Sequence, residues 1–218
     1  MRRAAAVVAC AALAAGGFAL RRTRPAAPSF ETVRAHHGPS DARLLDRHGV
    51  LLDARRIDPV HRRLDWTPLP AVSPLLRDAV LAAEDRRFAD HGGVDGRAVA
   101  ASLVQALRGG GRRGASTITM QLAALLDPSL RPRGGRRTLF QKWAQVRLAW
   151  ALERAWSKPQ ILEAYLNLVD FRGELTGVGA AAAGLFQTTP DAVDAAEAAV
   201  LAALMACLLY TSPSPRDA

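Results

Sequence analysis

Residues 83–95 read AEDRRFADHGGVD and place a carboxylate, Glu84, at the end of a helical pattern. Leu76, Val80 and Glu84 follow one another at a spacing of four, so Glu84 continues an apolar stripe. A carboxylate on a buried face loses hydration, and this raises its pKa toward the range that a general base needs. A structural ion pair at a helix end would explain the same residues, so this segment alone leaves both interpretations open.

The chain from residue 73 onward carries helical periodicity and helix-start signals. Ser73 and Ser116 are expected to cap the first and third helices. Ser157 and Gln160 form a capping box for the fifth. The sequence predicts helices at residues 74–90, 96–107, 117–126, 138–156, 158–168, 176–186 and 191–205. Residues 44–52 predict a short hairpin before them, so the expected fold class is mainly α with a small β-hairpin at its N-terminal edge.

The length and net charge of the chain limit the classes of function that it can have. The chain has 218 residues and a formal net charge of +9, with arginine supplying almost all of the positive charge. This length suits one domain with its own core, and the basic balance favours anionic partners such as phosphates or an acidic membrane surface. Nucleic acid is not expected, because the sequence has no zinc-finger spacing, aromatic RNA motif or recognition-helix signature. The two cysteines and five histidines show no metal-ligand spacing, so no metal site is predicted.

The N-terminal region is distinct from the rest of the chain. Residues 4–20 form an uncharged run flanked by arginines, at the lower length limit of a membrane span. We expect an uncleaved anchor at residues 1–22, with a cleaved signal peptide or a lipoprotein signal as alternatives. A linker is expected at 23–40 and a single domain at 41–206. Residues 207–218 break abruptly from an Ala-rich helix and are expected to be a non-native tail that truncates the domain.

A Gly- and Arg-rich loop, residues 109–114, runs into the helix start at Ser116 and Thr117. Free N–H groups and the positive dipole end of a helix suit a phosphate or diphosphate. The loop is not a nucleotide-binding P-loop, because no Gly-Lys-Ser/Thr follows it. A plain surface loop would explain the same composition.

The helix predicted at 138–156 has two contrasting sides. The apolar side chains that recur at helical spacing, and are expected to face the core, are Leu139, Trp143, Val146 and Trp150. Lys142, Gln145 and Glu153 lie on a different, polar side. Most polar faces are only solvated, but a lysine near an Arg-rich loop would also suit a diphosphate.

Together these segments resemble the glycosyltransferase domain of family 51, the peptidoglycan polymerases of bacterial cell-wall synthesis. The resemblance covers about residues 44–206, and its motifs lie at residues 84–93, 114–121, 142–153, 157–167, 177–182 and 194–203. Details at 125–128 and 170–173 are most similar to the penicillin-binding protein 1C branch. In that branch a transpeptidase domain normally follows.

The resemblance implies a lysozyme-like helical fold and an inverting transfer that links lipid II to a growing glycan strand and releases undecaprenyl diphosphate. By motif position Glu84 would be the catalytic base. The residues that would bind substrate are Asp85, Arg86, Phe88, His91, Ser116, Thr117, Gln121, Arg137, Lys142 and Gln145. No cofactor is required, although a divalent cation, Mg²⁺ or Mn²⁺, could assist. The implied location is the bacterial cytoplasmic membrane, single-pass, with the catalytic domain on the periplasmic face, where other cell-wall synthesis proteins are further candidate partners.

Two departures from the family pattern keep other functions open. Gln145 stands where many members have a second glutamate, and a glutamine cannot carry charge or act as an acid. Residues 185–188 read Leu-Phe-Gln-Thr in place of the usual Tyr-Phe-Gly-Lys. One alternative is a lysozyme-like glycan hydrolase or lytic enzyme, which would need a second carboxylate to hold water if it inverts. The other is a non-catalytic, membrane-anchored wall-assembly protein.

Overall fold

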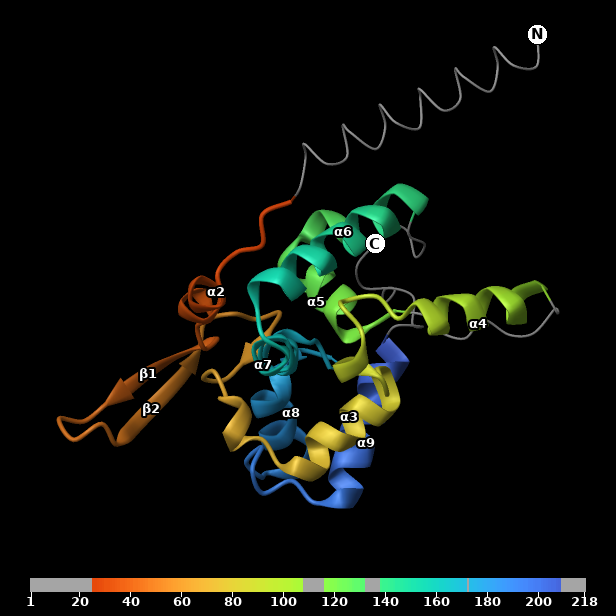
Figure 1. Ribbon diagram of the computed structural model, residues 1–218. Helices are drawn as coiled ribbons and strands as arrows, with labels where there is room; N and C mark the ends of the chain where they lie inside the picture. Colours follow the sequence, from red (N-terminus) through yellow and green to blue (C-terminus); the bar gives the residue numbers. More distant parts are fainter. Residues whose placement is uncertain (1–24, 108–115, 132–137, 172, 209–218) are drawn as a thin grey trace, which may run out of the picture.

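The computed structural model describes residues 25–107, 116–131, 138–171 and 173–208. It is mainly helical, as predicted, and Figure 1 shows the helices gathered into one body from which a hairpin and one helix project. The α-helices are α2 (Phe30–His36), α3 (Pro74–Glu84), α4 (Gly96–Leu107), α5 (Ile118–Leu126), α6 (Leu139–Ala155), α7 (Lys158–Leu168), α8 (Gly177–Phe186) and α9 (Ala195–Leu208). The shorter elements are β1 (Asp41–Leu45), β2 (Leu51–Arg56), β3 (Arg62–Arg63), β4 (Leu175–Thr176) and three 3₁₀ turns, η1 (Leu69–Ala71), η2 (Phe88–Asp90) and η3 (Pro128–Leu130).

The predicted hairpin is confirmed and is longer than residues 44–52. Strands β1 and β2 pair antiparallel from Asp41 opposite Arg56 to Leu45 opposite Leu51. The turn is built by Asp46, whose Oδ1 accepts hydrogen bonds from two backbone N–H groups at 2.8 Å. Gly49 completes the turn at a φ of +81°, a conformation that favours glycine. The hairpin extends away from the helical body (Figure 1).

The capping signals are confirmed in part. Ser157 and Gln160 form the predicted capping box at the start of α7. Ser73 precedes α3, but its side chain makes no capping hydrogen bond. Ser116 does not cap α5; Thr117 does, accepting from the N–H of Met120 at 3.2 Å. The sequence places two hydroxyl residues side by side there, and only the packing of α5 decides which one is at the N-cap.

Helix α3 ends at Glu84, so the predicted continuation to residue 90 is wrong. Asp85 leaves the helical conformation, with φ −157° and ψ 76°. Its buried carboxylate accepts from the N–H of Ile118 on α5 at 3.1 Å and contacts His91 Nε2 at 2.9 Å. These long-range hydrogen bonds draw the chain away from the helix axis. Helix propensity depends on neighbouring residues in the sequence, so it could not predict them.

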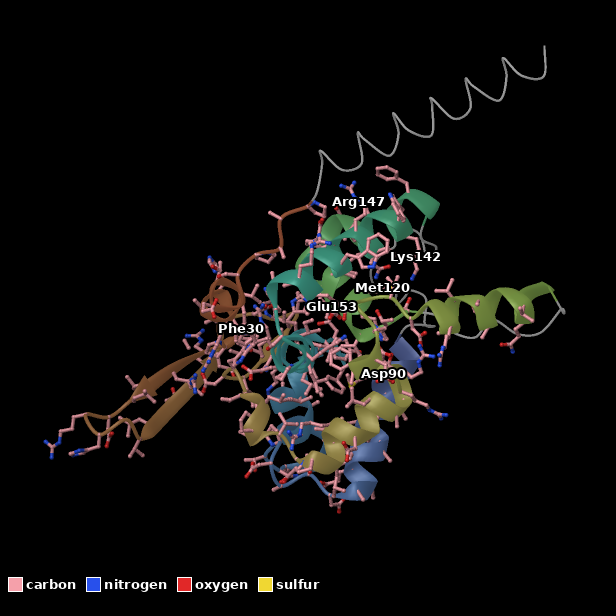
Figure 2. The ribbon with its side chains drawn as sticks, in the orientation of Figure 1. Phe30, Asp90, Met120, Lys142, Arg147 and Glu153 are labelled. Carbon is pink, nitrogen blue, oxygen red and sulfur yellow. The ribbon has the colours of Figure 1, made fainter. Side chains whose placement is uncertain are left out.

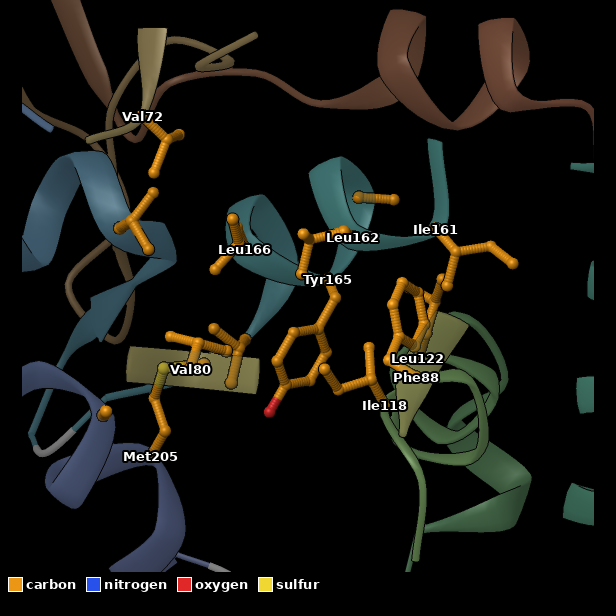
Figure 3. Close-up of a cluster of buried hydrophobic side chains, with 14 of the residues drawn as sticks. Val72, Val80, Phe88, Ile118, Leu122, Ile161, Leu162, Tyr165, Leu166 and Met205 are labelled. Atoms are coloured by element: carbon orange, nitrogen blue, oxygen red, sulfur yellow. The ribbon is translucent and has the colours of Figure 1, made fainter. Parts of the chain in front are cut away.

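The apolar core lies where α3, α5, α7 and α9 meet, and α6 covers α5 (Figure 1). Figure 3 shows Tyr165 of α7 at its centre, between Val80 of α3 and Ile118 of α5. Leu76 and Val80 are fully buried, so the stripe that the sequence predicted for α3 faces the core. This packing fixes the end of α3, and therefore Glu84, against α5.

The predicted core face of α6 is wrong for its two tryptophans, although Val146 is half-buried and packs against the core. Trp143 and Trp150 are 42% and 39% exposed, and their rings contact each other edge to face at 5.8 Å. The buried side of α6 instead carries small and aliphatic residues with one amide: Gln145, Leu148, Ala149, Ala151 and Leu152. Apolar residues lie on two sides of this helix, so periodicity alone could not identify the side that packs.

Part of the expected linker at 23–40 is folded. Ser29 caps α2, and Phe30 contacts the rings of Trp66 and Trp156 edge to face at 6.0 and 5.4 Å. The indole N–H of Trp156 also donates to the carbonyl of Pro28 at 2.9 Å. The expected anchor at residues 1–22 lies outside the described residues, and among the described helices none has the length and apolarity to span a membrane.

The departure from the family pattern at residues 185–188 affects the backbone at Gln187. Gln187 follows α8 at a φ of +55°, the left-handed conformation in which helices commonly end on glycine. The usual motif has glycine at this position, so the substitution keeps the geometry and adds the strain of a side chain.

Candidate active site

Glu84 is held at the last position of α3, half-buried against α5. Its Oε2 accepts a hydrogen bond of 2.7 Å from the Gln121 side-chain amide. Its Oε1 is buried and has no hydrogen-bond partner among the described residues. Burial raises the pKa of Glu84, the charge of Asp85 raises it further, and the Gln121 hydrogen bond opposes both. This is the environment of a carboxylate that can accept a proton near neutral pH.

Asp85 and His91 form a buried pair behind Glu84. Their side chains are 4% and 5% exposed, and His91 Nε2 lies 2.9 and 3.0 Å from the two carboxylate oxygens of Asp85. Asp85 Oδ2 also accepts from the N–H of Ile118, the first residue of α5. A carboxylate at a helix N-terminus satisfies an orphan donor and interacts favourably with the dipole. Both predicted site residues are therefore engaged in joining α3 to α5.

The start of α5 differs from the phosphate cradle that the sequence suggested. The N–H of Ile118 donates to Asp85 and that of Met120 to Thr117, so these donors are already engaged. Thr117 in turn donates to the carbonyl of Gly93 at 2.6 Å. The Gly- and Arg-rich loop at 109–114 lies outside the described residues. A lysine from α6 also lies beside this helix start.

Lys142 reaches from α6 to the start of α5. Its Nζ donates to Ser116 Oγ at 2.7 Å, and its side chain is half-buried. Figure 2 shows Lys142 and Glu153 on α6, with Met120 of α5 between them in the view. The structure thus brings together the second and third motifs, as the sequence predicted. Arg137, predicted on the same side, is outside the described residues.

Gln145 is not on a solvated polar face but fully buried between α6 and α5. Its Nε2 donates to the carbonyl of Met120 at 2.5 Å, while its Oε1 has no hydrogen-bond partner within the described part of the chain. A charged glutamate at this position would need strong compensation, whereas an amide needs less. Gln145 therefore ties α6 to α5 and does not supply an acid.

Lys158 and Glu153 form a second cluster that sequence reasoning did not assign to the site. Lys158 Nζ donates to Glu153 Oε1 at 2.8 Å and to the His91 carbonyl at 2.6 Å. It also lies 4.4 Å from the centre of the Phe88 ring, a cation–π geometry. Thr119 donates to the same Glu153 oxygen at 2.6 Å. No spacing rule connects these residues, because the loop after α3 and three separate helices supply them.

The remaining predicted residues lie around Glu84. Phe88 is buried, and Gln121 is buried with its amide on Glu84. Arg86 is exposed and donates from Nε to the carbonyl of Ala82 at 3.1 Å. Within the described segments no three His, Cys, Asp or Glu side chains gather in a group that could hold a metal ion.

A cavity of about 360 Å³ lies elsewhere, between the 25–28 segment, η3 and α6. None of the residues that line it belongs to the Glu84 site. The cavity and the Glu84 carboxylate therefore lie in different parts of the structure. We assign the site by chemistry, because Glu84, alone among the residues that the structure describes, combines burial, a raised carboxylate pKa and an oxygen without a partner.

Comparison with known proteins shows the family of the chain. A biosynthetic peptidoglycan transglycosylase of Pseudomonas syringae pv. syringae (strain B728a) is 37% identical over 160 residues, covering 73% of this chain and 63% of the relative. A protein of the same description from Rhodospirillum centenum (strain ATCC 51521 / SW) is 40% identical over 153 residues, 69% of this chain and 60% of the relative. The chain thus spans about three fifths of the length of these relatives. Residues 52–214 match the Transglycosylase family. The chain belongs to the Transglycosylase family.

Proposed function

We propose that this protein is a peptidoglycan glycosyltransferase that polymerises lipid II into β-1,4 glycan strands and releases undecaprenyl diphosphate. The observation that carries the proposal is Glu84, a half-buried carboxylate with a raised pKa and one oxygen without a partner in the described structure. Family membership and the descriptions of the relatives support the reaction class.

In the proposed step the Glu84 carboxylate takes the proton of the 4-hydroxyl of the incoming lipid II sugar. The hydroxyl oxygen then forms a bond to C1 of the donor sugar, with inversion. The bond from C1 to the diphosphate oxygen breaks, and its electron pair leaves with undecaprenyl diphosphate. General-base assistance of this kind contributes about 10²–10⁴-fold in rate.

The departing diphosphate gathers negative charge, and cations placed nearby stabilise it. Lys142 beside Ser116 is the described residue best placed for this role, with the exposed Arg86 at the end of α3. Arg137 is proposed with them on its sequence position alone. The proposal requires no organic cofactor, and a Mg²⁺ or Mn²⁺ would act as a counter-ion of the diphosphate oxygens.

Asp85, His91 and Gln145 take supporting roles in this proposal. Each is buried and hydrogen-bonded to α5 or to its partner in the site. Gln145 cannot exchange a proton, so Glu84 carries the base function without a second carboxylate from the third motif. We also propose membership of the penicillin-binding protein 1C branch, on the sequence details at 125–128 and 170–173.

We further propose that the protein works on the outer face of the bacterial cytoplasmic membrane. The uncharged run at residues 4–20 supports an anchor. Helix α6 supports contact with the bilayer, because exposed aromatic and basic residues recur along one side: Phe140, Trp143, Trp150 and Arg154. Aromatic rings and arginines together are typical of surfaces at the lipid headgroup level. The segment at 25–28 lies against the same helix, beside Ala144, Arg147 and Leu148.

Quenching of tryptophan fluorescence tests this contact. With the full chain in vesicles that contain brominated phosphatidylglycerol, we expect the emission to be quenched. The quenching should be lost in the double variant Trp143→Ala, Trp150→Ala, because Trp156 is buried and Trp66 largely packed. Val200→Ala, which removes an exposed apolar side chain on α9, is the matched control and should change nothing. Equal quenching in all three proteins would contradict the proposed contact.

Incubation of the purified protein with labelled lipid II tests the function. We expect glycan strands of increasing length and release of undecaprenyl diphosphate. Fragments released from finished glycan, without polymer from lipid II, would instead identify a hydrolase. Neither product from active-site-intact protein would identify a wall-assembly role.

A further inference from the structure

The hydroxyl of Tyr165 is a polar group buried in the apolar core. Tyr165 is 1% exposed on α7, and Figure 3 shows its hydroxyl at the end of the ring away from its helix. Burial, together with the charge of Glu84, raises the pKa of Tyr165 well above its ordinary value. The group therefore stays protonated and needs an acceptor. It donates to Gln121 Oε1 at 2.8 Å.

Gln121 links Tyr165 to Glu84 through a second hydrogen bond. Its amide presents Oε1 to Tyr165 and Nε2 to Glu84 Oε2, at 2.8 and 2.7 Å. A carboxylate can only accept, so the amide must turn its NH₂ group toward Glu84 when Glu84 is charged. The Tyr165 hydroxyl favours that orientation, because it donates to the opposite end of the same amide.

We propose that Tyr165 is a positioning residue for Glu84 and acts through Gln121. Tyr165 holds the Gln121 amide, and the amide holds Glu84 Oε2, which fixes the orientation of the carboxylate that takes the proton. The inference rests on the proposed polymerisation reaction. It adds a residue of α7 that no motif in the sequence had placed at the base.

The chain of hydrogen bonds from Tyr165 through Gln121 to Glu84, which we call the relay, favours the charged form of Glu84. Hydrogen bonding to a carboxylate lowers its pKa, and here it opposes burial and the charge of Asp85 on the adjoining turn. Across the described packing of α3, α5 and α7, the charged group that acts on Glu84 is Asp85, and Glu84 in turn acts on Tyr165. Phe in place of Tyr165 leaves Gln121 Oε1 without its donor, so the amide loses its hold and the pKa of Glu84 rises further.

The pH dependence of lipid II polymerisation tests the relay. Tyr165→Phe should move the acid limb of the kcat/KM profile to higher pH and lower kcat/KM by up to about tenfold at neutral pH, the upper scale of one lost hydrogen bond between neutral groups. The loss should shrink as the pH rises. Ile161→Val, a fully buried change on the same helix, is the structural control and should leave the acid limb in place. An equal loss by Tyr165→Phe at every pH would overturn the proposal.

A double-mutant cycle tests whether Tyr165 acts through Gln121. Gln121→Met keeps the length of the side chain and removes both hydrogen bonds. In that background Tyr165→Phe should change kcat/KM by less than about twofold, because the residue that transmits its effect is gone. Effects that multiply in the double variant would show that Tyr165 acts by another route.

A measurement of stability separates the relay from the proposed reaction. If wild-type protein does not polymerise lipid II, the reaction fails but the relay can still be tested. Glu84→Gln should raise the melting temperature at neutral pH more in the Tyr165→Phe background than in wild type, because charged Glu84 is then less well compensated. An equal rise in both backgrounds would reject the relay.

Discussion

Glu84→Gln is expected to lower kcat for lipid II polymerisation by about 10²–10⁴-fold, the contribution of a positioned general base. The amide has nearly the shape of the carboxylate, so α3 and α5 should pack as before. It cannot act as a base, and position 145, where many family members have a second glutamate, is a glutamine in this chain. The measurement is the initial rate of glycan formation from labelled lipid II at saturating substrate.

The same variant should be more stable than wild type at neutral pH. The folded-state pKa of Glu84 is raised by burial, so its ionisation destabilises the fold as the pH rises above the ordinary Glu value of about 4.3. The gain in melting temperature should therefore be present at pH 7 and disappear below about pH 4. Glu31→Gln, at an exposed site on α2, is the matched control for loss of one negative charge. Unchanged polymer yield in Glu84→Gln would remove Glu84 as the base.

Gly177→Ala is expected to destabilise the fold by about 3 kcal/mol or more, the sum of backbone strain and overpacking. Gly177 has a φ of +82°, and an added Cβ would lie 2.6 Å from the carbonyl oxygen of Asn167. That backbone is firmly held, because the Asn167 side chain bonds both backbone groups of Thr67 at 2.7 and 2.8 Å. Thermal unfolding followed by circular dichroism should show a melting temperature lower by about 10 °C.

Gly173→Ala provides the matched control for this prediction. Gly173 has a similar φ of +75°, but an added Cβ would meet nothing within 4 Å. Only the backbone strain of about 1 kcal/mol should appear there. Equal losses in the two variants would show that the close approach of α8 to Asn167 contributes nothing to stability.

The tertiary structure decided which side of α6 is buried and where α3 ends. The bulky aromatic residues of α6 predicted its core face, yet Trp143 and Trp150 are exposed, while Gln145 is fully buried. The sequence predicted that the first helix continues past Glu84 to residue 90. Asp85 instead leaves the helical conformation, and its carboxylate accepts a hydrogen bond from the N–H of Ile118. In both cases the deciding partner comes from another helix, and a one-dimensional pattern holds no information about it.

The sequence by itself determined the helical class, the hairpin, the Leu76–Val80–Glu84 stripe and the capping box of α7. These features depend on local periodicity and on side chains a few residues apart. Only the tertiary structure placed Gln121 on Glu84, Tyr165 behind Gln121, and Lys142 beside Ser116. Those contacts join residues at least 26 positions apart in the chain, and they form because α5 packs between the other helices. The candidate base was therefore readable from the motif, whereas the groups that contact it depended on helix packing.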